Sequence, residues 1–144
     1  MTSGSASTIA DLPESVRTLF DRERRGVLTT LDPHGSGHSV PIVFVVSGSE
    51  IVSPIDHKPK TGGELARVRN IERDDRVTVL VDHWDEDWTR LAWVMVRGHA
   101  VIDPDAPFDV VQSLNARYRQ YAPDERPDAL IRIRPAKLRW WTWA

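Results

Sequence analysis

The pattern of apolar and polar positions predicts a chain built mainly of short β-strands. Apolar and β-branched residues alternate with polar ones, or form short runs, over residues 26–31, 38–46, 51–54, 76–82, 92–102, 131–134 and 138–143. The turn residues over 32–37 predict a β-hairpin between the first two runs. The run over 38–46 is apolar on both faces. That pattern is typical of a strand buried on both sides, or of one that faces both a barrel core and a partner.

Three other segments have a helical pattern. Residues 11–26 place Val16, Leu19 and Phe20 on one face, and residues 61–70 and 105–121 are the other two segments. The strands do not alternate regularly with helices, so a small barrel is favoured over a doubly wound sheet. We therefore predict a mostly β (α+β) fold, a small β-barrel of about six to seven antiparallel strands with two to three flanking helices. We expect residues 1–10, which are small and polar, to form a disordered tail, and residues 11–144 to form a single domain.

Composition narrows the classes of function. The formal net charge of -2 argues against a general nucleic-acid binder, and the absence of cysteine excludes disulfides and thiolate chemistry. No stretch approaches the roughly 18 consecutive apolar residues of a membrane span. The first ten residues lack the basic start and apolar centre of a signal peptide, so we expect a cytoplasmic protein.

A rigid basic segment stands out against this background. Lys58 and Lys60 flank Pro59 directly after an apolar run, although the chain has only three lysines. Thr61 and two glycines then lead into the predicted helix, whose free N–H groups favour an anion. These features indicate a phosphate site. The residues alone leave open a solvated loop with incidental lysines, because no Walker-type glycine pattern is present.

Side-chain catalysis and metal binding have little support. The chain has no Gly-x-Ser-x-Gly elbow, and the acidic stretch 82–87 lacks the spacing of a calcium loop. His34 and His38 are separated by glycines, so they do not share a helical face. His99 is interpreted as a structural or interface residue. We predict no metal site and assign no catalytic residue.

The tryptophans fall into two clusters. The six are Trp84, Trp88, Trp93, Trp140, Trp141 and Trp143. They suit a core or a dimer interface, and the functional alternative is a platform that stacks a planar heterocycle. A protein that offers an anion site and aromatic walls, without reactive side chains, suits a cofactor that performs the chemistry itself.

These segments together resemble a known family. "GVLTTLDPHGSGHSVPIVFVV", "IDHKPK", "LARVRNIERDDRVTVLVDHWDEDWTRLAWVMVRGHAVI" and the terminal tryptophan strand resemble the pyridoxamine 5'-phosphate oxidase-like split β-barrel. The similarity is strongest to the small actinobacterial deazaflavin (coenzyme F420)-dependent oxidoreductases, and it covers nearly all of residues 14–143.

The resemblance implies a homodimer with two equivalent cofactor sites at the subunit interface. It implies that the cofactor ring is bordered by His38, Ser39, Val40 and Pro41. It also implies that Lys58 and Lys60 hold the phosphate, while Pro59 and Thr61 shape the loop. The partner subunit would close the site with Trp88 or Trp93, and Trp141 is a third candidate. The glutamate tail of F420 would benefit from Arg67, Arg69 and Arg73.

The activity implied is hydride transfer between F420 and a small unsaturated organic substrate. His38 and Arg90 are the candidates for proton delivery. An FMN-dependent oxidase or reductase of the same fold, and a non-catalytic carrier or sensor of F420 or flavin, are the alternatives. Pyridoxamine phosphate is not the expected substrate, because the residues that grip its phosphate in the oxidases find no match here.

Overall fold

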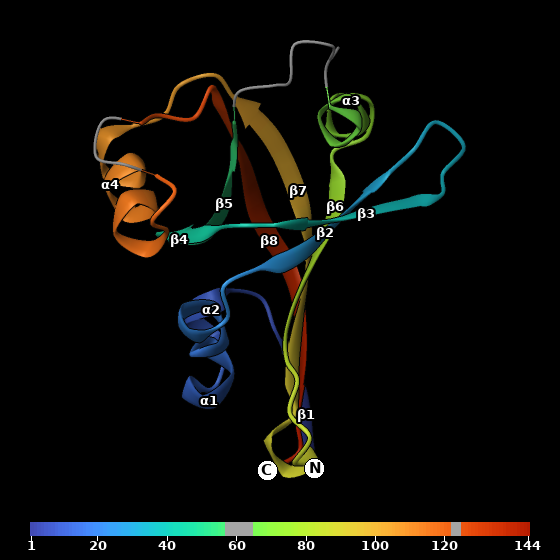
Figure 1. Cartoon of the computed structure of the whole chain (residues 1–144). Coiled ribbons are helices and arrows are strands. Elements are labelled where there is room, and N and C mark those ends of the chain that lie inside the picture. Colours follow the sequence, from blue (N-terminus) through green and yellow to red (C-terminus); the bar gives the residue numbers. More distant parts are fainter. Residues whose placement is uncertain (57–64, 122–124) are drawn as a thin grey trace.

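The computed structural model describes residues 1–56, 65–121 and 125–144. Over these residues the chain forms an eight-stranded antiparallel sheet in the order β3-β2-β6-β7-β8-β5-β4, with β1 paired to β8 (Figure 1). The strands are β1 Thr2–Ala6, β2 Gly26–Leu31, β3 Gly37–Ile42, β4 Val45–Ser47, β5 Glu50–Ile55, β6 Arg76–His83, β7 Ala92–Asp103 and β8 Ala129–Thr142. The predicted fold class, a mostly β split barrel with flanking helices, is confirmed.

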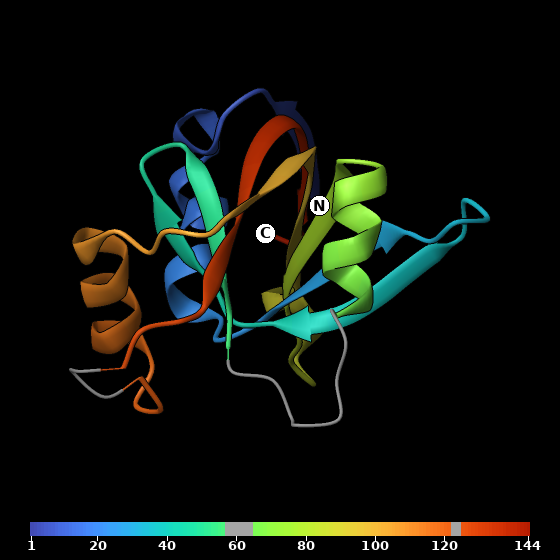
Figure 2. The ribbon, with the colours of Figure 1, turned by 90° about the horizontal axis from the view of Figure 1, so that it is seen from above.

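Short helices cover parts of this sheet. They are α1 Glu14–Arg17, α2 Leu19–Arg22, α3 Ala66–Arg73 and α4 Phe108–Arg117, with 3-10 turns η1 Ile9–Asp11 and η2 Trp88–Arg90. The view from above shows α3 and α4 on opposite sides of β7 and β8 (Figure 2). The single helix predicted over 11–26 is two short helices, yet Val16, Leu19 and Phe20 are buried, as their shared face indicates.

Strand β8 organises the sheet. Its 14 residues pair along one edge with β7, from Ala92↔Thr142 to Asp103↔Leu130. We expected two strands, over 131–134 and 138–143. The structure joins them, because Pro135 lies opposite Gly98 at an irregularity of the ladder, where a missing N–H is tolerated.

The N-terminal residues correct another expectation. The prediction of a disordered tail over 1–10 is wrong for residues 2–6, which form β1 and pair with β8 from Thr2↔Thr142 to Ala6↔Leu138. The pairing uses backbone groups, which small polar residues supply as well as apolar ones do. Gly4 lies under Trp140, where an added Cβ would come within 2.8 Å of the indole ring.

The run over 38–46 is divided into β3 and β4 by a side chain. The Tyr118 hydroxyl accepts a hydrogen bond from Phe44 N at 3.0 Å and lies 2.9 Å from Phe44 O. The backbone of Phe44 therefore bonds to Tyr118 instead of continuing a ladder. Two apolar clusters meet here, a larger one between α1, α2 and the central strands, and a smaller one between α4, β4 and β5.

Candidate functional site

The central strands bury one face and leave the other open. The side chains of Val79, Val94 and Leu138 point into the main core and are 0% exposed. Successive side chains of a strand point to opposite faces, so the residues between them form an outer face. In the described part of the chain, α1 and α2 pack on the inner face, and the outer side chains of β6 and β7 are exposed or half-buried.

A row of hydroxyl groups crosses this outer face. The register places Ser39 opposite Thr29, Thr29 opposite Thr78, and Thr78 opposite Arg97, whose partner on β8 is Lys137. The Ser39 and Thr29 hydroxyls are 2.8 Å apart and form a hydrogen bond. We call Ser39, Thr29 and Thr78 the hydroxyl row; it ends at two cationic residues.

An apolar row runs beside the hydroxyl row. Pro41 lies opposite Val27, Val27 opposite Leu80, and Leu80 opposite Met95, with Arg139 following on β8. Neighbouring side chains on one face of a strand are about 7 Å apart. The outer face therefore offers a strip of apolar surface next to a strip of hydroxyl groups.

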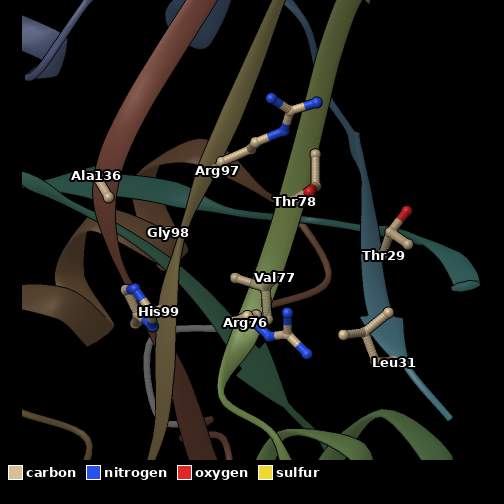
Figure 3. A pocket seen from close by; sticks show the side chains of 9 residues that line it. All are labelled: Thr29, Leu31, Arg76, Val77, Thr78, Arg97, Gly98, His99 and Ala136. Carbon is tan, nitrogen blue, oxygen red and sulfur yellow. The ribbon is translucent and has the colours of Figure 1, made fainter. Parts of the chain in front are cut away.

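A cavity of about 290 Å³ opens on this face, at the cationic end of the hydroxyl row (Figure 3). Its lining comes from β2, β6, β7 and β8, and consists of Thr29, Leu31, Arg76, Val77, Thr78, Arg97, Gly98, His99 and Ala136. The lining combines hydroxyl groups, three groups that can carry positive charge, and a few apolar side chains. That combination suits a partly polar, anionic organic ligand.

Two of the positive groups have acidic partners. The Arg76 guanidinium bonds to both carboxylate oxygens of Asp74, at 3.0 and 2.7 Å, and this hydrogen bonding lowers the pKa of Asp74 to about 2. His99 Nδ1 lies 3.0 Å from Asp75 Oδ1. Arg97 has no ion pair within the described ranges. It is the lining cation with no carboxylate partner, and thus the one most available to a ligand.

The predicted ring-binding residues divide between the two faces. Ser39 and Pro41 lie on the outer face with the two rows, whereas His38 and Val40 point to the inner side. His38 lies opposite Thr30, whose hydroxyl accepts a hydrogen bond from Asn70 of α3 at 3.0 Å. The structure thus brings two of the four residues to the candidate site by side chain; His38 and Val40 can border it through the backbone alone.

Two buried polar atoms on the α3 side have no hydrogen-bond partner among the residues that the structure describes. They are His38 Nδ1 and Arg67 Nε. Burial lowers the pKa of Arg67, and Asp56 opposes that effect. Of the arginines proposed for an acidic tail, Arg67 is half-buried. Arg73 donates hydrogen bonds to Leu31 O and Asn70 Oδ1, at 2.7 and 2.9 Å.

The predicted phosphate site cannot be placed. Lys58, Pro59, Lys60 and Thr61 lie outside the described residues, and so does the beginning of the helix predicted over 61–70. The flanking elements are the end of β5 at Ile55 and the beginning of α3 at Ala66. The lysine pair stays a prediction.

The candidate tryptophans lie away from the hydroxyl row of the same chain. Trp88 is 58% exposed on η2, at the far end of the β6–β7 hairpin. Trp93 is half-buried on β7 opposite Trp141, four residues before Arg97 and thus about 13 Å along the strand. Their predicted contact with the cofactor requires a second subunit and stays a prediction.

Sequence reasoning missed Thr29, Thr78 and Arg97 as site residues, and interpreted His99 as structural. A signal was present, since polar residues at 76, 78, 97 and 99 alternate with buried valine, glycine and alanine. The register that places them beside Ser39 was not available from that alternation.

Between residues 1 and 144, leaving out 57–64 and 122–124, no three His, Cys, Asp or Glu side chains are arranged to hold a metal ion. No helix in the same ranges is long and apolar enough to cross a membrane.

Several solved structures have a fold similar to that of this chain. A structure called F420 reductase has a TM-score of 0.65 and 26% identity, covering 88% of this chain and 98% of that one. General Stress Protein 26 from Bacillus anthracis has a TM-score of 0.62 and 22% identity, covering 87% and 89%. A conserved hypothetical protein from Mycobacterium tuberculosis has a TM-score of 0.68 and 20% identity, covering 92% and 86%.

No curated protein matches the sequence. The sequence profile of the pyridoxamine 5'-phosphate oxidase family, in contrast, matches residues 12–142. That span includes every strand of the sheet except β1. The chain therefore belongs to the pyridoxamine 5'-phosphate oxidase family.

Proposed function

We propose that this protein is an oxidoreductase that binds coenzyme F420 on the outer face of its sheet and reduces a small unsaturated organic substrate. The observation that carries the proposal is the pairing of the hydroxyl row with the apolar row, next to a cavity with cationic groups. A bound deazaflavin supplies a hydride, which none of the protein's side chains can do.

Each part of the outer face has a task in this proposal. The apolar row, from Pro41 to Met95, excludes water from one side of a planar ring. The hydroxyl row offers donors and acceptors to a polyhydroxylated chain such as ribityl. Arg97 supplies a charge-assisted hydrogen bond to an anionic group. The residues that are described thus fit a phosphorylated flavin or deazaflavin.

The choice of F420 over FMN rests on the comparison with F420 reductase, which extends over 98% of that protein's length. FMN has a phosphate after a ribityl chain as well, so the same lysine pair can serve either cofactor. The proposal therefore needs a direct competition between the two.

We further propose that two copies of the chain share this face. Leu80 is 37% exposed in the single chain, and Trp93 and Met95 on the same face are half-buried. Apolar side chains of this kind are enriched at subunit interfaces. A second copy could then bring its Trp88 to the cofactor. Light scattering tests this proposal directly, and a stable monomer would remove the shared site.

The decisive experiment is a fluorescence titration of the purified protein with F420 and, separately, with FMN. We expect tighter binding of F420. The double variant Lys58→Ala/Lys60→Ala should weaken that binding by about 2–4 kcal/mol, given the usual strength of charge-assisted hydrogen bonds.

Arg119→Ala, an exposed cation that follows α4, is the matched control and should leave the affinity unchanged. If the protein bound FMN more tightly than F420, FMN would take the place of F420 as the proposed cofactor. Tight F420 binding with no reduction of quinones or enones would favour a carrier over an enzyme.

A further inference from the structure

His99 and Asp75 form a geometrically defined pair at the edge of the cavity. His99 Nδ1 is 3.0 Å from Asp75 Oδ1, and the backbone N–H of Ala100 donates to Asp75 O at 2.9 Å. Asp75, just before β6, is therefore fixed to β7 by its main chain while its side chain holds the imidazole. A carboxylate on Nδ1 fixes the orientation and the tautomer of a histidine.

The other ring nitrogen of His99 is left for the cavity. Within the described ranges Nε2 has no hydrogen-bond partner, and His99 is one of the residues lining the cavity (Figure 3). The ladder irregularity next to His99 places Ala136, a small side chain, between the paired positions of β8. The residue of β8 that is paired with His99 is Arg134, and the residue of β6 that is paired with it is Arg76.

At Gly98 the backbone of β7 lies very close to the backbone of β8, which only a residue without a side chain allows. A Cβ on Gly98 would lie 2.2 Å from Arg134 O, a distance that no side chain can adopt. β-Bulges of this kind commonly aim a side chain at a functional site. Here the neighbouring side chains are Arg97 and His99, both of which line the cavity.

The proposed reaction needs a proton as well as a hydride. Hydride addition to a neutral C=C or C=O bond leaves a negative charge on the substrate, which a proton must neutralise. Among the nine residues that line the cavity, the arginines do not release protons and the threonine hydroxyls are poor acids. His99 carries the one imidazole of this lining, and imidazole is the side-chain group that enzymes use most often as a general acid or base.

We propose that His99 is the catalytic proton donor to the substrate and that Asp75 is its positioning residue; this inference rests on the proposed function. An α,β-unsaturated carbonyl receives two electrons and one hydrogen as hydride from the reduced cofactor. The proton bonded to His99 Nε2 of the imidazolium goes to the resulting enolate. The neutral imidazole keeps its Nδ1–H on Asp75. The His99 side chain is 45% exposed, so water can return the proton.

The test compares two substrates of the F420-loaded protein. An enone such as cyclohexenone needs a hydride and a proton, whereas the N-methylacridinium cation needs a hydride alone, because its product is neutral. In His99→Asn the ratio of enone rate to acridinium rate should fall about 100-fold, the lower range of general acid catalysis. Asp75→Asn should lower the same ratio by a smaller factor.

His34→Asn is the matched control, since His34 lies exposed in the β2–β3 turn away from the cavity. It should leave the ratio unchanged. Equal slowing of both substrates in His99→Asn would overturn the proton-donor assignment while leaving the oxidoreductase intact. If the wild-type protein reduces neither acceptor although it binds F420, the proposed function fails first and the inference falls with it.

A spectroscopic measurement on the protein without cofactor tests the pair independently. At a pH high enough to deprotonate the imidazolium, the ¹⁵N NMR shifts of His99 should show the remaining proton on Nδ1 in the wild type, and a shift toward the Nε2–H tautomer in Asp75→Asn. A tautomer that is the same in both proteins would overturn the positioning role of Asp75.

Discussion

The two faces of β6 and β7 are built from alternate residues of the same segments, yet they differ in almost every property. The inner face of the two strands holds Val77, Val79, Val81, Val94 and Val96, and the outer face holds Arg76, Thr78, Leu80, Arg97 and His99. The inner residues are at most 4% exposed. Inner residues therefore stabilise the fold, whereas their immediate neighbours in the sequence form the proposed site. A substitution on one face should affect stability or function, but not both.

The largest expected effect belongs to the inner face. Leu138→Ala removes a side chain that is 0% exposed, and should lower the free energy of unfolding by about 2–5 kcal/mol through lost burial and a cavity. Urea denaturation measures it. Val101→Ala, at an outer position that is 58% exposed, is the control, and should change the same quantity by about 0.5 kcal/mol or less. Equal losses would contradict the difference between the faces.

Gly98 is a buried position on the inner face of β7, and its substitution comes second. In Gly98→Ala the new methyl would overlap Arg134 O, and relief of this overlap should cost about 1–3 kcal/mol of unfolding free energy. Gly37→Ala is a suitable comparison, because its Cβ would meet Thr29 Cγ2 at 3.3 Å, which a side chain can relieve. Thermal denaturation of both variants gives the answer. A Gly98→Ala protein as stable as Gly37→Ala would show that the ladder irregularity tolerates a side chain.

On the outer face the effect should appear in binding. Thr29→Val keeps the shape of the side chain and removes the hydroxyl that bonds to Ser39. We expect F420 affinity to fall by about 0.5–1.5 kcal/mol, the net value of one hydrogen bond, with little change in stability. Fluorescence titration measures it, and Ser113→Ala on α4 is the control away from the sheet. A loss of stability without a loss of affinity would remove the hydroxyl row from the site.

The smallest effect concerns acid stability. Hydrogen bonding from Arg76 lowers the pKa of Asp74 to about 2 in the folded protein, from 3.8 without such contacts. A lowered pKa means that Asp74 stabilises the fold above pH 3.8 and that this contribution is lost as the pH falls toward about 2. The stability difference between wild type and Asp74→Asn should therefore shrink over that interval. A constant difference, in denaturation curves collected across it, would show that the ion pair does not contribute.

Much of the fold was readable because alternation reports burial directly. The strands over 76–82 and 92–102 were predicted within one residue of β6 and β7, since buried valines recur there at every second position. The errors have particular causes. The two strands expected over 131–134 and 138–143 are one strand, in which Pro135 is accommodated opposite Gly98, and Tyr118, 74 residues away, interrupts the run at Phe44. Both causes are partners distant in sequence, which a local pattern does not contain.

The site was predicted less completely for the same reason. Ser39 and Pro41 were selected through the resemblance and do lie on the outer face, but His38 and Val40 point the other way, as the period of a strand requires. Thr78 and His99 reach the same cavity through the registers of β2, β6 and β7. The register of a sheet is fixed by packing between strands. A single sequence therefore shows that polar residues alternate along a strand, but not which residues of the neighbouring strands lie beside them.

The pairing of β1 with β8 has a consequence for how the chain is made. Thr2 and its partner Thr142 are 140 residues apart in the sequence, so β1 is synthesised long before the strand with which it pairs. Contacts of such long sequence separation form late, because closing the loop costs entropy before the pairing repays it. A strand with the sequence TSGSA is well suited to that delay. It is too polar and too rich in small residues to pair with other nascent chains while it remains unpaired.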